Sequence, residues 1–171
     1  MRNRRPLHFI SREKEWQLIQ ELLINIDSSN FDPKDTVILM VSPDYSASVS
    51  MILSHAWSVK GEILPIIAVY VPYPDEDYKP FREMFISQYT EIAKYKKIIC
   101  VEAGIIRGGN WTWLLNAILD FQYSREDITL VALCENVHSK LKSDYVGEYY
   151  NDLEEELTFY YEHFNKHWEV R

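Results

Sequence analysis

The sequence has few glycines, few cysteines and no long apolar run. Five of its 171 residues are glycine and two, Cys100 and Cys134, are cysteine. No apolar stretch approaches the roughly 20 residues of a membrane-spanning helix, and the basic start is not followed by the apolar core of a secretory signal. The cysteines lie in apolar runs without the spacing of a metal site or a disulfide framework. We therefore expect reduced core cysteines, a cytoplasmic protein and no membrane partner.

The chain also lacks an excess of positive charge. Its formal net charge is -8, whereas neutralising the phosphates of a nucleic acid requires a basic face, so we expect no nucleic-acid partner. The composition, with 47% hydrophobic and 26% charged residues, is typical of a globular protein. This length is typical of one domain with a substantial core, so we expect a single domain over residues 1–171.

Strand-like and helix-like segments alternate along the chain. Helical spacing of apolar residues follows a candidate N-cap at Ser11, and the later helices and strands are predicted from similar patterns. The predicted helices are 11–26, 48–57 and 111–121, and the predicted strands are 36–41, 62–71, 97–102 and 128–134. This alternation predicts an α/β fold with a mostly parallel central sheet flanked by helices. The tail from residue 156 fits either a strand or a helix.

Two predicted loops are candidates for a binding site. Ligands of such sheets bind at the carboxyl ends of the strands, which points to residues 42–48 and 102–112. The second loop lies in "VEAGIIRGGNWTW", which holds Gly104, Gly108 and Gly109. Glycines that lead from a strand into a helix allow backbone N–H groups to approach an anion, and the helix dipole favours it. The alternative is a tight turn whose glycines only permit positive φ.

Side chains of this segment offer the groups that a phosphorylated sugar needs. Asn110 and Thr112 can donate hydrogen bonds, and Arg107 can supply a positive charge. Glu102 can hold a ribose hydroxyl or, through water, a magnesium ion. The segment matches neither the dinucleotide-binding glycine signature nor the P-loop.

In its order of strand, acid, aliphatic residues, glycine and threonine, the segment resembles the type I phosphoribosyltransferases, in particular the 6-oxopurine enzymes. Their third strand runs into a signature of the form V-[ED]-D-x-x-x-T-G-x-T. The resemblance continues in "VALCENVHSKLKSDYVGEYY", similar to the fourth strand and purine-side segment, and in "ELTFYYE", similar to a closing "WIVFPWE". It is collinear over about residues 10–162.

The resemblance implies a reaction and a set of site residues. Members of this family transfer a ribose phosphate from phosphoribosyl pyrophosphate to a purine nitrogen with magnesium, and they suggest a homodimer. The resemblance divides the chain into an N-terminal arm (1–9), a hood-like segment (72–96) and a purine-side and C-terminal segment (135–171). The implied residues of the phosphate and ribose site are Gly108, Gly109, Asn110, Trp111 and Thr112.

The chain departs from the family at the catalytic and pyrophosphate positions. Glu102 keeps one member of the acidic pair that holds ribose and magnesium, but Ala103 or Gly104 stands in the second place. Arg107 replaces the acid that can accept a proton at the purine. The pyrophosphate loop has lost its glycines and basic residue, and its positions are Ser42, Pro43, Asp44 and Tyr45.

The base side also departs from the family. The lysine that reads the purine oxygen corresponds to Asn136, or to Glu135 if the register slips by one, and the stacking aromatic corresponds to Glu156 or Leu157. Aromatic character persists at Tyr160 and Tyr161. The implied base-side residues are Asn136, His138, Asp144, Tyr145 and Tyr161.

Three functions remain open at this point. One is a protein that binds a nucleotide or ribose phosphate but has lost efficient purine salvage, which the missing acid and glycines favour. A second is an active phosphoribosyltransferase with altered chemistry, which would use magnesium and phosphoribosyl pyrophosphate. The third is a protein-interaction module that keeps only the scaffold. Fold alone does not choose among them.

Overall fold

The chain folds into alternating strands and helices. The computed structural model describes residues 6–29, 31–41, 43–72, 78–121, 123–151 and 156–159, and of residues 43–45 and 156 it describes the backbone. The helices are α1 (Arg12–Asn25), α2 (Pro43–Ala56), α3 (Tyr78–Gln88) and α4 (Gly109–Leu119), with 3-10 helices at Thr90–Lys94 and Arg125–Asp127. The strands are β1 (Leu7–Ile10), β2 (Thr36–Val41), β3 (Ile66–Val69), β4 (Lys97–Ile105), β5 (Ile128–Asn136), β6 (Tyr145–Tyr150) and β7 (Glu156–Phe159).

Five strands form the main sheet, in the order β3-β2-β4-β5-β6, and every neighbouring pair is parallel. Strands β2, β4 and β5 are buried along almost their whole length. Helices cover both faces of such a sheet, which explains why these strands are continuous apolar runs rather than alternating ones. The predicted α/β fold with a mostly parallel sheet is confirmed.

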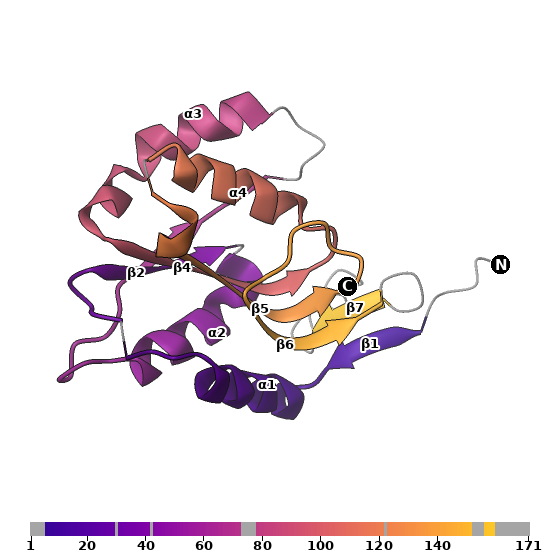
Figure 1. Ribbon diagram of the computed structural model, residues 1–171. Coiled ribbons are helices and arrows are strands. Elements are labelled where there is room, and N and C mark those ends of the chain that lie inside the picture. The colour runs from indigo at the N-terminus through magenta and orange to yellow at the C-terminus, as the bar shows by residue number, and fades with distance from the viewer. Residues whose placement is uncertain are drawn as a thin grey trace, which may run out of the picture.

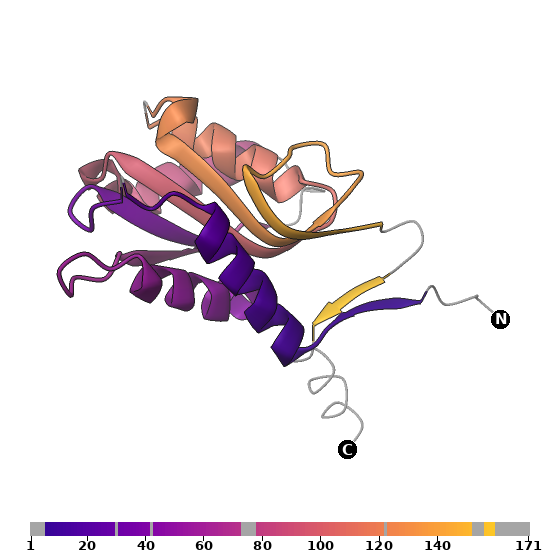
Figure 2. The ribbon, with the colours of Figure 1, turned by 60° about the horizontal axis from the view of Figure 1, so that its bottom comes forward.

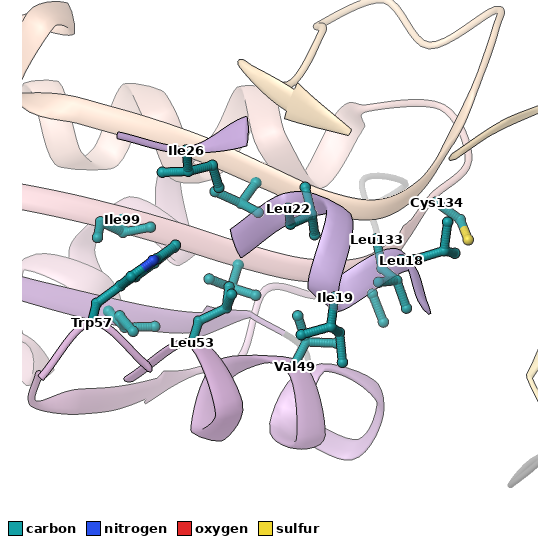
Figure 3. Packing of buried hydrophobic residues seen from close by; sticks show 14 of the residues in the cluster. Leu18, Ile19, Leu22, Ile26, Val49, Leu53, Trp57, Ile99, Leu133 and Cys134 are labelled. Carbon is teal, nitrogen blue, oxygen red and sulfur yellow. The ribbon is translucent and has the colours of Figure 1, made fainter. Parts of the chain in front are cut away.

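The helices form two layers, one on each face of the sheet. Helices α1 and α2 lie on one face, and α3 and α4 lie on the other (Figure 1). Figure 3 shows part of the first core cluster, in which Ile19 of α1 and Val49 of α2 lie close together. Within the described part of the chain, no helix is both long and apolar enough to cross a membrane.

Helix α1 begins where the sequence predicts. The Ser11 hydroxyl caps it by accepting a hydrogen bond from the backbone N–H of Lys14 at 3.1 Å. Glu13 and Glu15 occupy its first turn, where the helix dipole favours negative charge. The helix buries Leu18, among other residues, against the sheet. The predicted cap and helix are confirmed.

Strands β1 and β7 form a separate two-stranded parallel sheet, with Leu7 opposite Glu156 and Ile10 opposite Phe159. Figure 2 shows this pair side by side, apart from the main sheet and next to the start of α1. The expected N-terminal arm therefore differs from the structure at residues 7–9, which belong to β1. The tail, which the sequence pattern left open, is a strand at residues 156–159.

Three of the predicted boundaries that differ from the structure bear on the candidate site. Residues 43–48 are not a loop, because α2 begins at Pro43, and proline is favoured in the first turn of a helix. The predicted strand 62–71 is shortened to β3, which begins just after Pro65, a residue without a backbone N–H. Strand β4 continues to Ile105, so Glu102 lies inside a strand rather than at its end.

The segment expected as a hood, residues 72–96, packs against the body of the chain where it is described. Phe81 and Phe85 of α3 are buried, and their ring centroids are 5.8 Å apart. Tyr78 and Phe81 each have a ring centroid 5.8 Å from that of Trp113 in α4. These aromatic side chains therefore stabilise the α3–α4 layer within the chain.

Candidate functional site

The sheet changes winding direction between β2 and β4, which places a candidate site at their carboxyl ends. Chain order runs from β2 outward to β3, and β4 then lies on the other side of β2. Ligands of open parallel sheets bind in the crevice at such a switch point. Met40 faces Val101 across the two strands, so Glu102 lies beside the end of β2. The two predicted loops flank this point, although α2 has replaced most of the first.

Glu102 is at the predicted place but is not presented to solvent. Its side chain is buried, and its Oε1 accepts a hydrogen bond from the backbone N–H of Ala103 at 3.1 Å. A carboxylate that grips two ribose hydroxyls has to face an open crevice. In this structure the Glu102 side chain is instead buried within the protein, at a position inside β4.

The place of the second acid is filled by apolar residues. Ala103 is fully buried in the core cluster that includes Phe159. A Cβ added at Gly104 would lie 2.8 Å from Leu157 Cδ2 and 3.3 Å from Phe159 Cε2, both side chains of β7. Strand β7 thus packs directly on the carboxyl half of β4, and neither candidate position has room for a solvated carboxylate.

The described residues do not fit a magnesium site. Among the described residues, no group of three or more histidine, cysteine, aspartate or glutamate side chains comes together as a set of metal ligands. The carboxylate expected to hold the ion, that of Glu102, is buried and accepts a hydrogen bond from the backbone N–H of Ala103.

The predicted phosphate-binding turn is a helix start. Gly108, at φ 73°, is the N-cap of α4, and no described side chain caps this end of the helix. Gly109 and Asn110 in the first turn are half-buried, and Arg107 is exposed. The first backbone N–H groups of a helix have no partner within it, and they attract anions. The turn therefore presents the backbone donors that a phosphate requires.

Two other residues predicted for this turn have structural partners. Trp111 is fully buried, and its Nε1 donates to Ser143 Oγ at 3.0 Å. The Thr112 hydroxyl donates to the carbonyl of Gly108 at 3.0 Å, although the side chain lies at an exposed position. Trp111 thus holds α4 in place, while Thr112 could exchange its internal bond for one to a ligand.

The connection between β5 and β6 packs tightly against the turn. A Cβ added at Gly108 would lie 2.5 Å from Ser139 Oγ and 3.1 Å from the backbone N of Leu141. Asn136 Nδ2 donates to the carbonyl of Ile106 at 2.7 Å, which links the two segments. Gly108 is thus required by its positive φ and by this close contact, whatever binds beside it.

The predicted base-side residues fall at opposite ends of the sheet. Asn136 ends β5 at the carboxyl edge, and its Oδ1 accepts from the backbone N–H of His138 at 3.0 Å. Asp144 and Tyr145 lie at the start of β6, where Tyr145 is opposite Val131 near the start of β5. Asp144 accepts hydrogen bonds from the backbone N–H of Leu130 at 2.7 Å and from Arg125 Nη2 at 2.6 Å. The structure therefore does not bring these four residues together, and Tyr161 lies outside the described residues.

Several residues at the site were not predicted. Glu135, which the sequence offered only as a register alternative, is fully buried and accepts from the backbone N–H of Ser143 at 2.8 Å. Lys142 Nζ lies 3.2 Å from its other oxygen. Together they hold the β5–β6 connection against the end of β5. An acid at the end of an apolar strand, followed by a lysine, is the only signal for this pair in the sequence.

Of the predicted pyrophosphate residues, Ser42 lies outside the described residues. The backbone of Pro43, Asp44 and Tyr45 forms the first turn of α2. This position matches the expected place of the loop along the chain, but its conformation is helical. A glycine-rich loop around pyrophosphate is therefore replaced by a helix start at residues 43–45.

Comparison with known proteins identifies the fold. At the level of sequence, no protein-family model and no curated protein matches the chain. Among solved structures, it is similar to the Helicobacter pylori xanthine-guanine-hypoxanthine phosphoribosyltransferase, with 15% identity and a TM-score of 0.63 over 98% of this chain and 99% of that one. A purine phosphoribosyltransferase from Pyrococcus horikoshii is 13% identical, with a TM-score of 0.63 over 90% of this chain and 92% of that one.

A hypoxanthine phosphoribosyltransferase from Staphylococcus aureus is 12% identical, with a TM-score of 0.56 over 82% of this chain and 76% of that one. The agreement extends over nearly the whole chain in the first case, so the likeness is one of complete domains. It rests on backbone arrangement, because so few residues are identical. The chain therefore has the fold of the type I phosphoribosyltransferases.

Proposed function

We propose that this protein binds a phosphate-bearing ligand, a nucleotide or a ribose phosphate, and does not carry out efficient phosphoribosyl transfer. The proposal rests on a contrast between the two halves of residues 101–113. The start of α4 presents uncapped backbone donors at Gly109 and Asn110, whereas Ala103 and Gly104 are packed against apolar side chains.

The phosphate would lie at the start of α4. A phosphate at a helix N-terminus gains hydrogen bonds from the free backbone N–H groups and a favourable interaction with the helix dipole. The exposed Arg107 adds a positive charge next to this turn. The place of the turn, after the central strand β4 of a phosphoribosyltransferase fold, is where the resemblance puts the 5′-phosphate.

The transfer reaction lacks its usual supports. Its oxocarbenium-like transition state requires carboxylates near the ribose, and its pyrophosphate requires a cation-rich loop. Here one acid is buried, the second is absent, and residues 43–45 are helical. Each charge-assisted hydrogen bond is worth roughly 1.5–3 kcal/mol, so losing several lowers the rate by many factors of ten.

Calorimetry with ribose 5-phosphate, inosine monophosphate and phosphoribosyl pyrophosphate tests the binding. We expect saturable binding of at least one of them, and Arg107→Ala should weaken it about tenfold by removing a charge-assisted contact. Lys34→Ala is the matched control, because Lys34 is exposed and precedes β2 at the opposite edge of the sheet. Absence of binding to all three ligands would reject the proposal.

The alternative of an active transferase is tested on the same sample. Glu102 beside the switch point is the observation in its favour. Protein-dependent release of pyrophosphate with any of a panel of purines and pyrimidines, in the presence of magnesium, would favour it over a binding protein. We also propose a cytoplasmic homodimer, in line with the family resemblance, and light scattering on the purified protein tests its mass.

A further inference from the structure

A groove on the opposite face of the sheet from α4 has the features of a second ligand site. It lies between α1 and α2, has a volume of about 560 Å³, and is far along the chain from the turn at 107–112. Its described walls combine charged, aromatic and aliphatic side chains: Arg12, Glu13, Glu15, Trp16, Ile19, Ser48 and Ile52. Ile19, on the inner wall, belongs to the core cluster between α1 and α2 (Figure 3).

Glu15 is the unusual residue of this groove. Its side chain is only 4% exposed, yet among the described residues its carboxylate has a single hydrogen-bond partner, the Ser48 hydroxyl, whose Oγ lies 2.5 Å from Oε1. A buried carboxylate ordinarily requires a cation or several donors to compensate for its lost hydration. Glu15 lies in the first turn of α1, where the helix dipole stabilises its negative charge in part. A cationic group of a ligand would provide the remaining stabilisation.

The neighbours of Glu15 indicate what kind of cation fits. The indole of Trp16 is 48% exposed at the groove, and Trp is the best aromatic partner for an organic ammonium group. Ile19 and Ile52 provide apolar surface beside it. An inorganic ion would use none of this apolar lining, whereas an amine on an apolar body would use all of it.

Arg12 adds an opposite requirement. It stands three residues before Glu15, on the same side of the helix, and lines the same groove. An exposed guanidinium disfavours a ligand with positive charge alone and favours one that also carries a carboxylate. We propose that the groove binds a small zwitterion of the amino-acid class, with its ammonium group at Glu15, its carboxylate at Arg12 and its apolar side chain on Trp16.

The experiment compares three probes that share a phenethyl body and differ in the charged groups attached to it: L-phenylalanine, phenethylamine and 3-phenylpropionate. Each is titrated into ¹⁵N-labelled protein, and the indole N–H signal of Trp16, assigned with Trp16→Phe, is followed. We expect a saturable shift with phenylalanine and at least about tenfold weaker binding of each analogue, since each lacks one charge-assisted contact. No saturable shift with phenylalanine, or equal affinity for phenylalanine and phenethylamine, would overturn the proposal.

Variants assign the two charges. Glu15→Gln should weaken phenylalanine binding about tenfold or more, and Glu21→Gln, an exposed change on the same helix outside the groove, should leave it unchanged. Arg12→Gln, at an exposed position that the fold tolerates, should abolish the preference for phenylalanine over phenethylamine. Unchanged binding in Glu15→Gln, or an unchanged preference in Arg12→Gln, would contradict the assignment even if the other variant failed to fold.

Discussion

The two halves of the segment 101–113 use their glycines in different ways. Gly104, in the first half, lies against the side chains of β7, which fill the space that a second acid would occupy. Gly108, in the second half, turns the chain at positive φ into α4, whose first backbone N–H groups have no described side-chain cap. The first half therefore packs into the hydrophobic core, and the second half is the start of a helix.

This difference separates two roles that the sequence signature of a phosphoribosyltransferase combines. The turn can persist because its glycine is required by the fold, through its φ and its contact with Ser139. A second acid beside Glu102 would have no such structural role, and apolar side chains of β7 lie at its place here. A retained glycine pattern is therefore weaker support for catalysis than a retained pair of acids.

Restoring the second acid should have the largest effect. Gly104→Asp would place a Cβ 2.8 Å from Leu157 Cδ2 and a carboxylate among the apolar side chains of β7, and should destabilise the protein by about 3–5 kcal/mol. Urea denaturation measures this. Ile106→Asp is the control, because Ile106 is 53% exposed and the same change there should cost at most about 0.5 kcal/mol. Equal stability of the two variants would mean that the first half is open to solvent.

Replacing Gly108 should have a smaller effect, and Gly61 provides a matched control. Both glycines have positive φ, 73° and 85°, so alanine at either costs about 1–2 kcal/mol in backbone strain. A Cβ at Gly61 has no atom within 4 Å, whereas one at Gly108 meets Ser139 Oγ at 2.5 Å, which adds about 1–3 kcal/mol. The double variant Gly108→Ala/Ser139→Ala should recover part of this excess. If Gly108→Ala and Gly61→Ala cost the same in thermal unfolding, the β5–β6 connection does not press on the turn.

Cys134 is paired with Gly104 across β4 and β5. The pH dependence of stability that its thiol causes should therefore report whether water is excluded around the first half of the segment. Burial raises the pKa of its thiol to about 12, against about 8.5 in an unfolded chain. The unfolded state therefore releases this proton first, and stability from this group, complete below about pH 8.5, is lost as the pH rises toward 12. Its contribution falls by about 1 kcal/mol per pH unit.

The measurement is the free energy of unfolding at several pH values in wild type and Cys134→Ala. The alanine variant should lose less stability than wild type between pH 8.5 and 10, a range given by the two pKa values above. Identical pH dependence of the two proteins would show that the thiol is not in a dry environment.

Local sequence patterns predicted the elements of the fold but not the contacts between distant ones. The alternation of apolar runs predicted the parallel sheet, and Ser11 predicted the start of α1. Both predictions succeeded because strands and helix starts depend on residues that are neighbours along the chain. The filling of the Gly104 position depends on β7, more than fifty residues away along the chain. Pro43 was a local signal for a helix start. The prediction missed it because this segment was expected to be the pyrophosphate loop.

The start of α4 also follows from local sequence, whereas its proposed role in binding stays a prediction. The turn from β4 into α4 lies where the residues 108–112 predicted it. The base side did not come together, since Asp144 and Tyr145 follow a connection that returns along the sheet to the start of β6. Residue order along a strand-to-strand connection does not reveal which end of the sheet the connection reaches.

Phosphorus NMR of the protein with phosphoribosyl pyrophosphate, magnesium and a mixture of purine bases tests the central claim most directly. It observes binding and turnover in one sample, because bound ligand changes its own signals and transfer releases free pyrophosphate. The account predicts that the 5′-phosphate signal shifts or broadens in wild type, less so in Arg107→Ala, while no pyrophosphate accumulates. Unchanged ligand signals, or steady protein-dependent accumulation of pyrophosphate, would contradict it.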